Sequence, residues 1–538
     1  MARFYIENFG CRATQADGAA LERQFLERGL ERAGAARDAE IVVLNTCTVT
    51  EGADKDARAS IRRLQRVNPN CRILVTGCYA QRAPAELAAM PGVTWVVGNS
   101  HKHQAAEIAT TPFASGGFVP IEDLSGEWGQ FPPLLKERER VGQPKKLEPL
   151  GNIVVGNIFA HTELMAAPVF EAANERTRPN LKVQDGCDNR CSFCVIPYVR
   201  GQSRSLPAKR VITEVRTLVE AGYREVVISG INLGRWGRDL EGRSQFSVVS
   251  SQSVVGRRPL VAGREESQQP ESNRERRTTN DQRLVELIRA ILDHTALEKL
   301  RISSVEPMDW SDELIDLVAL SPRIAKHAHV PMQSGSDAVL RRMHRKYRPW
   351  HYREKILKIR NAMPRAAIGA DVMVGFPGES AAEFDETRRT IEELPFTYLH
   401  VFTYSARPGT PATDQPGQVP VGIARERNGV LREIGSAKKQ AFLRSLVGTE
   451  VEAITLQAGG DDFTEALTEN YLKVKIAGRL DANRWMRLCV ERVEGEMLVA
   501  RPSGPTVGEQ GWEEAAVVTR ECTKENSHID LQPIARVT

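Results

Sequence analysis

The chain has 538 residues, of which 41% are hydrophobic and 26% are charged, and its formal net charge is +4. This length allows two to four domains of roughly 150 residues each, and the balanced charge neither requires nor excludes a nucleic-acid partner. We expect no membrane contact, because no stretch approaches the ~18 consecutive apolar residues of a membrane helix. The first residues, MARFYIENFGC, lack the pattern of a secretory signal. A cytoplasmic location is therefore expected, and the nine cysteines are not expected to form disulfides there.

Residues 1–112 alternate between predicted strands and predicted helices. The strands are expected at 2–8, 40–46, 71–77 and 94–99, and the clearest helical patterns cover 15–30 and 53–68. Strand–helix alternation is typical of parallel sheets with crossover helices. We predict an N-terminal α/β domain with an open parallel sheet.

The rest of the chain divides into four predicted segments. Residues 113–178 are rich in Gly, Pro and charge and are expected to form a linker. Residues 179–435 carry six strands, each followed by a helix, which indicates a partial (β/α)6 barrel. A polar stretch at 239–282 is expected to be a flexible insertion in that barrel. Short strands over 436–503 predict a small all-β barrel, and 504–538 is expected to be a loose tail.

Three cysteines follow the first strand of the predicted barrel closely. The segment GCDNRCSFCVIPYVRG contains Cys187, Cys191 and Cys194 in the spacing C-x3-C-x2-C. Three thiolates on one loop can hold three irons of a [4Fe–4S] cluster and leave the fourth iron open for a ligand. The alternative is a zinc loop whose fourth ligand lies elsewhere in the sequence. The position after a barrel strand favours a functional site, because such sites lie at the carboxyl ends of the strands.

A second set of cysteines marks the N-terminal domain. Cys11, Cys47 and Cys78 each follow one of its first three strands. Because the carboxyl ends of neighbouring parallel strands meet at one edge, we expect these thiols to lie close together. We interpret them as ligands of a second [4Fe–4S] cluster, while the alternative is three unrelated thiols packed in the core. Cys71 begins the third strand, on the order of 20 Å from that edge, and is interpreted as structural.

The segment GCDNRCSFCVIPYVRG resembles the cluster motif of the radical S-adenosylmethionine (SAM) enzymes. Combined with a second three-cysteine set and a small C-terminal β-barrel, the chain resembles the methylthiotransferases. This resemblance implies two [4Fe–4S] clusters and SAM as cofactors, and a TRAM RNA-binding domain over 436–503. In that family a deoxyadenosyl radical removes a hydrogen, the second cluster carries the sulfur, and another SAM supplies the methyl group.

Further residues are expected to bind SAM or RNA. Polar residues and glycine at the ends of barrel strands are candidates for SAM binding. They are Gly230, Asn232, Ser304, Glu306, Gln333 and Asp371. Cations near aromatic residues are candidates for RNA binding. They are Arg341, Arg345, Lys473 and Lys475, although a solvated charged surface explains the first two nearly as well.

The segments NTCTVTEGADKDARASIRRLQRVNP, VTGCYAQRAPAEL and GCRATQAD resemble the members that modify N6-threonylcarbamoyladenosine in tRNA. The expected reaction adds a methylthio group at C2 of this base at position 37. Isopentenyladenosine in tRNA or a ribosomal-protein aspartate is the alternative substrate, and a non-catalytic iron–sulfur RNA-binding protein is a third hypothesis. The expected partners are tRNA and an electron donor such as flavodoxin or ferredoxin, and the expected state is a monomer.

Overall fold

A computed structural model gives the fold and describes residues 2–111, 153–160, 164, 178–240, 283–460 and 462–503. The predicted tail, most of the predicted linker and all of the predicted insertion except residues 239 and 240 lie outside these residues. The chain divides into two compact units, residues 1–435 and 436–538. The domain boundaries predicted from the sequence stay a prediction. None of the helices within the described ranges is long and apolar enough to cross a membrane.

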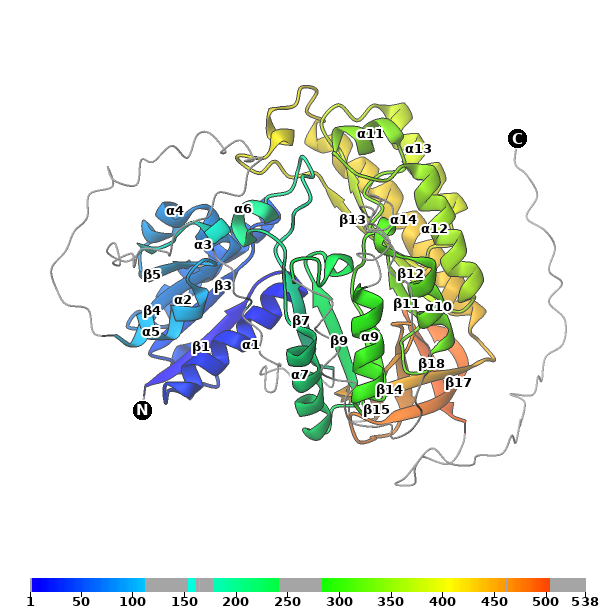
Figure 1. The fold of residues 1–538 in the computed structure, drawn as a ribbon, viewed down its shortest axis with the longest axis horizontal. Helices are drawn as coiled ribbons and strands as arrows, with labels where there is room; N and C mark the ends of the chain where they lie inside the picture. The colour runs from blue at the N-terminus through cyan, green and yellow to red at the C-terminus, as the bar shows by residue number, and fades with distance from the viewer. Residues whose placement is uncertain are drawn as a thin grey trace, which may run out of the picture. The chain divides into compact units, whose positions relative to one another are not determined.

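The N-terminal part of the first unit is a parallel sheet of six strands in the order β2-β1-β3-β4-β5-β6 (Figure 1). The strands are β1 (Arg3–Asn8), β2 (Glu31–Arg32), β3 (Ile41–Thr46), β4 (Arg72–Gly77), β5 (Val93–Gly98) and β6 (Ile153–Val154). The helices are α1 (Arg12–Glu27), α2 (Glu51–Val67), α3 (Cys78–Arg82), α4 (Pro84–Ala88) and α5 (Ala105–Thr110). The predicted open parallel sheet is confirmed.

Both faces of this sheet are covered, as its apolar strands require. On β3, Val42 and Leu44 join one hydrophobic cluster, while Ile41 and Val43 join another on the opposite face. This follows from the two-residue period of side chains along a strand. The strands β2 and β6 have only two residues each, and β6 lies within the segment predicted as a linker.

The second part of this unit is a partial barrel of six parallel strands with one short antiparallel addition, β8. The order β10-β9-β7-β8 forms one sheet and β11-β12-β13 forms the other, and one parallel bridge, Leu300 to Ile324, adds to them. The strands are β7 (Asn180–Asp185), β8 (Arg204–Ser205), β9 (Glu225–Gly230), β10 (Lys299–Ile302), β11 (His327–His329), β12 (Ala367–Val374) and β13 (Tyr398–Thr403). All six predicted barrel strands are present.

Helices follow the barrel strands, and all of them except the five-residue helix after the cysteine loop contribute to one continuous core around the barrel. They are α6 (Ile196–Arg200), α7 (Ala208–Glu220), α9 (Arg283–His294), α10 (Asp312–Leu320), α11 (Asp337–Arg342), α12 (Pro349–Ala362), α13 (Ala381–Glu393) and α14 (Val421–Ser445). The short helix α6 comes directly after the loop with three cysteines. The ladders in the described residues do not join β13 to β7, so the barrel is open, as predicted.

The second unit contains a closed barrel in the order β14-β15-β16-β18-β17. Its strands are β14 (Glu450–Gly460), β15 (Phe463–Thr468), β16 (Lys473–Ala477), β17 (Trp485–Glu494) and β18 (Met497–Pro502). Leu488, Val474 and Leu498 lie fully buried in its core. Closure leaves no free sheet edge, and the predicted small all-β barrel is confirmed.

Candidate functional site

The structure brings the three N-terminal cysteines to one edge of the sheet. Cys11 caps α1 after β1, Cys47 follows β3, and Cys78 begins α3 after β4. These three strands are direct neighbours. Burial, together with the nearby thiols of Cys78 and Cys11, raises the pKa of Cys47 to about 12. The three thiols therefore share one electrostatic environment.

Gly10 allows this close approach. Its φ is +96°, and a Cβ at this position would lie 2.5 Å from Cβ of Cys47 and 2.8 Å from its Sγ. Any larger residue would therefore clash with the cysteine and strain the backbone. Cys71, in contrast, packs in the hydrophobic cluster with Ile73. Burial raises its pKa with no contribution from another thiol, as expected for a structural cysteine.

The three barrel cysteines lie on the loop between β7 and α6, and nitrogen donors contact two of them. The Asn189 backbone N–H lies 3.4 Å from Cys187 Sγ, and Asn232 Nδ2 lies 3.6 Å from the same sulfur. Arg345 Nη1 lies 3.2 Å from Cys191 Sγ. Burial and the neighbouring Cys191 thiol raise the pKa of Cys194. Donors aimed at sulfur suit a thiolate that binds metal.

Arg345 does not lie where the sequence suggested. Its side chain is 5% exposed and forms an ion pair with Glu306 in addition to its contact with Cys191. The buried guanidinium lies beside the barrel cysteines rather than on the surface, and its predicted contact with RNA stays a prediction. The Tyr347 ring lies 5.0 Å from its guanidinium carbon and encloses it further.

Five of the six residues predicted to bind SAM lie at or just after the ends of barrel strands, whereas Asp371 lies inside β12. Their surroundings differ. Asn232 Oδ1 and Gln333 Oε1 are buried without a hydrogen-bond partner in the structure. Ser304 Oγ lies 3.0 Å from His329 Nδ1, and Asp371 Oδ1 lies 3.4 Å from His329 Nε2. Glu306 pairs with Arg345, and a Cβ on Gly230 would lie 2.8 Å from Gln184 Oε1.

Two further hydroxyl groups at this edge lack partners. Ser229 Oγ near the end of β9 and Ser303 Oγ just after β10 are buried and unpaired. Buried polar atoms without partners are rare and call for a ligand or water. The atoms of Ser229, Ser303, Asn232 and Gln333 therefore fit a polar ligand such as SAM. Sequence reasoning missed both serines, although each is next to a residue that it selected.

Each cysteine set offers three thiols, the number that a [4Fe–4S] cluster with one open iron requires. Within the described ranges, no group of three or more His, Cys, Asp or Glu side chains is able to hold one metal ion. A [4Fe–4S] cluster does not require such a group, because each thiolate binds a different iron. Three thiols without a fourth in each set leave one iron for another ligand.

The other predicted RNA contacts lie on the surface and have carboxylate neighbours. Arg341 forms an ion pair with Asp337 at 2.9 Å. Lys473 lies 3.5 Å from Glu465, and Lys475 lies 3.7 Å from Glu494 and 4.8 Å from the centre of the Phe463 ring. Exposed ion pairs of this kind are weak, so these cations stay accessible, and their RNA role stays a prediction.

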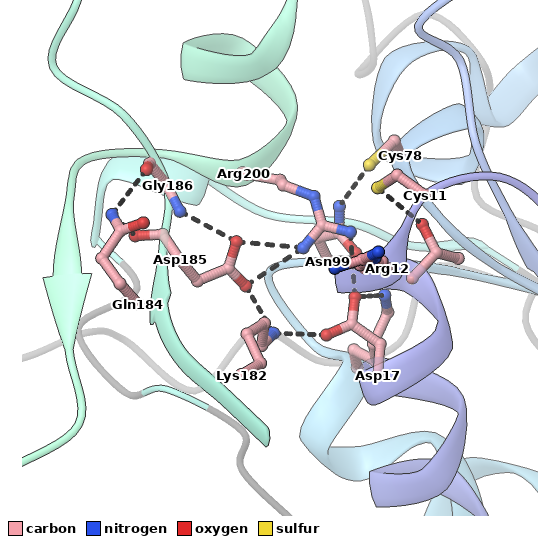
Figure 2. A network of polar contacts seen from close by, with 12 residues as sticks. Cys11, Arg12, Asp17, Cys78, Asn99, Lys182, Gln184, Asp185, Gly186 and Arg200 are labelled. Carbon is pink, nitrogen blue, oxygen red and sulfur yellow. Dashed lines mark hydrogen bonds and ion pairs between the residues drawn. The ribbon is translucent and has the colours of Figure 1, made fainter. Parts of the chain in front are cut away.

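Sequence reasoning also missed a charged network between the two cysteine sets. It contains Asp17, Lys102, Lys182, Asp185 and Arg200 (Figure 2). The only local signal was a charged residue on an otherwise apolar face, such as Asp17 between the alanines of α1 or Lys182 in β7. The three partners of Asp17 lie 85 to 183 positions away in the chain.

Two family profiles match parts of the chain. The profile of the Uncharacterized protein family UPF0004 matches residues 3–98, and that of the Radical SAM superfamily matches residues 261–391. A solved structure, the radical S-adenosylmethionine methyltransferase TsrM from Kitasatospora setae, aligns with a TM-score of 0.44 and 13% identity over 85% of this chain and 79% of that one.

Two curated relatives match nearly the full length. Threonylcarbamoyladenosine tRNA methylthiotransferase MtaB of Bacillus subtilis is 33% identical over 485 residues, which is 89% of this chain and 92% of that protein. The tRNA-2-methylthio-N(6)-dimethylallyladenosine synthase of Saccharopolyspora erythraea is 29% identical over 470 residues, which is 86% of this chain and 81% of that protein.

Proposed function

The chain belongs to the radical SAM methylthiotransferase family, and we propose that it adds a methylthio group at C2 of N6-threonylcarbamoyladenosine at position 37 of tRNA. The observation that carries the proposal is the presence of two three-cysteine sets, each at the carboxyl ends of strands, within one compact unit. The name of the relative from Bacillus subtilis supports the choice of base.

Cys187, Cys191 and Cys194 are proposed to hold the [4Fe–4S] cluster, and Cys11, Cys47 and Cys78 a second one. When bound, the barrel cluster with SAM supplies a radical that removes hydrogen, and the second cluster supplies sulfur. Insertion into an unactivated C–H bond needs both reagents close to one carbon atom. Proximity and orientation of this kind contribute to catalysis directly.

The chain's own residues hold and orient these groups. Asn232 and Arg345 present donors to the sulfurs of Cys187 and Cys191, and such contacts orient metal-binding ligands. The unpaired oxygens of Ser229, Ser303 and Gln333 are proposed to bind polar groups of SAM, together with the predicted residues nearby. The barrel cysteines are only partly exposed, and further exclusion of water when substrate binds would protect a reactive radical from side reactions.

Two alternative substrates would undergo the same chemistry. The relative from Saccharopolyspora erythraea is named for dimethylallyladenosine, that is, isopentenyladenosine, and it keeps the first alternative open. A ribosomal-protein aspartate is the second alternative. We further propose that the enzyme acts as a monomer in the cytoplasm, with flavodoxin or ferredoxin as its electron donor, and that Arg341, Lys473 and Lys475 contact tRNA.

The test combines iron analysis with nucleoside mass spectrometry. Reconstituted protein should hold about eight irons, and the Cys187/Cys191/Cys194→Ala variant about four. The reconstituted wild-type protein is then incubated with tRNA that carries either N6-threonylcarbamoyladenosine or isopentenyladenosine. A methylthio product on the first base alone supports the proposal. A product on the second base, or on a ribosomal protein, would replace it. Cys71→Ser is the matched control and should keep all irons.

A further inference from the structure

The short helix α6 contacts both cysteine sets. It begins two residues after Cys194, and Val195 and Val199 pack against Cys78 in one small hydrophobic cluster. Asn99 Nδ2 donates to the Val199 carbonyl oxygen at 2.8 Å and lies 3.5 Å from Cys78 Sγ (Figure 2). One helical turn of the barrel therefore forms part of the surroundings of the N-terminal cysteines.

Arg200, the last residue of α6, joins a buried ionic network. Arg200 Nη2 lies 3.0 Å from Asp17 Oδ2, and Arg200 Nη1 lies 3.0 Å from Asp185 Oδ1. Lys182 bonds both carboxylates, and Lys102 Nζ lies 2.9 Å from Asp17 Oδ2. All five side chains are at most 9% exposed. Figure 2 shows the carboxylate of Asp17, on α1, facing the cations of the barrel.

Stability alone does not explain five buried charges. Each ion loses its hydration on burial, and well-packed apolar residues often stabilise a protein as well or better. What ion pairs and hydrogen bonds add is a fixed geometry, because the partners fit only in one arrangement. Here Asp17 belongs to the N-terminal domain, whereas Lys182, Asp185 and Arg200 belong to the barrel. The network therefore fixes how the two cysteine-bearing parts meet.

The charges in the network do not balance. Its three cations face two carboxylates, and Arg204 is a further cation near Asp185. Figure 2 shows Arg200 beside Cys11 and Cys78, and Val199, the residue before Arg200, packs against Cys78. Three thiolates outweigh the positive charge of an oxidised four-iron core, so the assembled cluster is anionic. A surplus positive charge at this place compensates it in a region of low dielectric constant.

We propose that Asp17 is a positioning residue that holds the N-terminal cysteine set against the barrel cysteine set through Lys182 and Arg200. This inference rests on the proposed function, since it concerns the delivery of sulfur to the carbon that has lost its hydrogen. Loss of the network should leave SAM cleavage intact and reduce sulfur transfer. A misplacement of about 1 Å can cost on the order of a hundredfold in rate.

The test uses Asp17→Asn, which keeps the side chain's size and removes its charge. The control is Glu225→Gln, which removes one carboxylate from the fully buried ion pair with Arg301 inside the barrel, 2.6 Å long. Two readouts are taken. The first is hydrogen exchange of α1 and α6 in the apoprotein. The second is the ratio of 5′-deoxyadenosine to methylthio nucleoside formed by the reconstituted enzyme.

Asp17→Asn should speed exchange in α1 and α6 and raise the ratio by about tenfold or more, with iron content unchanged. Glu225→Gln should speed exchange in β9 and β10 and leave the ratio at the wild-type value. An equal rise in Glu225→Gln would overturn the inference, because the effect would then reflect a loosened fold. A wild-type product ratio together with wild-type hydrogen exchange in Asp17→Asn would also overturn the inference.

A second variant covers the case in which Asp17→Asn does not fold. Lys182→Met leaves Arg200 and Lys102 as partners of Asp17 and should raise the ratio to a smaller extent. A folded Lys182→Met protein with wild-type ratio and exchange would refute the inference. If the wild-type enzyme forms no methylthio product on any substrate, the proposed function fails, and the exchange data alone decide whether Asp17 joins the two parts.

Discussion

Replacing Arg345 with methionine should lower the reduction potential of the barrel cluster. Arg345 Nη1 donates to Cys191 Sγ at 3.2 Å, and its side chain is 5% exposed, so solvent screens this contact little. Hydrogen bonds and positive charge near a cluster's sulfurs favour the reduced, more negative state. A hydrogen bond from a charged group contributes about 1.5–3 kcal/mol. For one electron this corresponds to about 65–130 mV, because 59 mV equals a factor of ten in the equilibrium constant.

The measurement is a redox titration followed by electron paramagnetic resonance. It is made in a Cys11/Cys47/Cys78→Ala background, so that only the barrel cluster contributes. Arg341→Met is the control, because Arg341 lies on the exposed side of α11 and pairs only with Asp337 in the described structure. Its potential should match that of the background protein. An unchanged potential in Arg345→Met, with the cluster retained, would show that Arg345 does not interact with Cys191 in the loaded enzyme.

Three further predictions concern the cysteines, a glycine and a histidine. Replacing Cys11, Cys47 or Cys78 with serine should retain SAM cleavage and stop methylthio transfer, and complete loss of cleavage with an intact barrel cluster would contradict this division. Gly10→Ala should reduce the iron content from about eight to about four, because its Cβ would clash with Cys47. The control is Gly52→Ala on α2, where the added Cβ would have only Thr50 Oγ1 nearby, at 3.7 Å, and this variant should keep all irons. Burial and the nearby Arg301 hold the pKa of His327 well below 6.5, so the unfolded chain gains a proton that the folded one excludes, and stability falls as the pH drops below 6.5. His327→Gln should remove up to about 1.4 kcal/mol of this loss of unfolding free energy per pH unit, as measured by chemical denaturation at pH 7 and pH 5.5. The control His351→Gln replaces an exposed histidine and should keep the wild-type loss. An equal dependence of stability on pH in wild type and His327→Gln would refute the assignment.

The strands and the cysteine spacings were predictable because their signals are local. Apolar runs such as 41–46 and 225–230 predict buried strands whatever surrounds them. The C-x3-C-x2-C spacing needs only eight residues. By contrast, β2 and β6 have two residues each, too few for any period to appear. They exist because a neighbouring strand offers them hydrogen bonds.

Residues whose role depends on distant partners were beyond the sequence. Arg345 lies in a cationic run that resembles a solvated surface, and it is buried because Cys191, 154 positions away, and Glu306 meet it. Asp17 looks like an isolated charge on a helix until β7 and α6 supply its partners. The hydrophobic periodicity of a helix or strand indicates which of its faces is buried, but it does not indicate which charged side chains pair on that face.

The length of α6 limits which sequence changes this helix can tolerate. Five residues separate Cys194 from Arg200, and both ends of this segment are fixed, one at the barrel cysteines and the other at Asp17 and Asp185. Each residue added to a helix rotates all later side chains by about 100°. A single insertion in this turn would therefore point Arg200 away from both carboxylates. Substitutions within α6 can be absorbed by repacking, whereas changes in its length cannot, so its spacing is constrained more strictly than its composition.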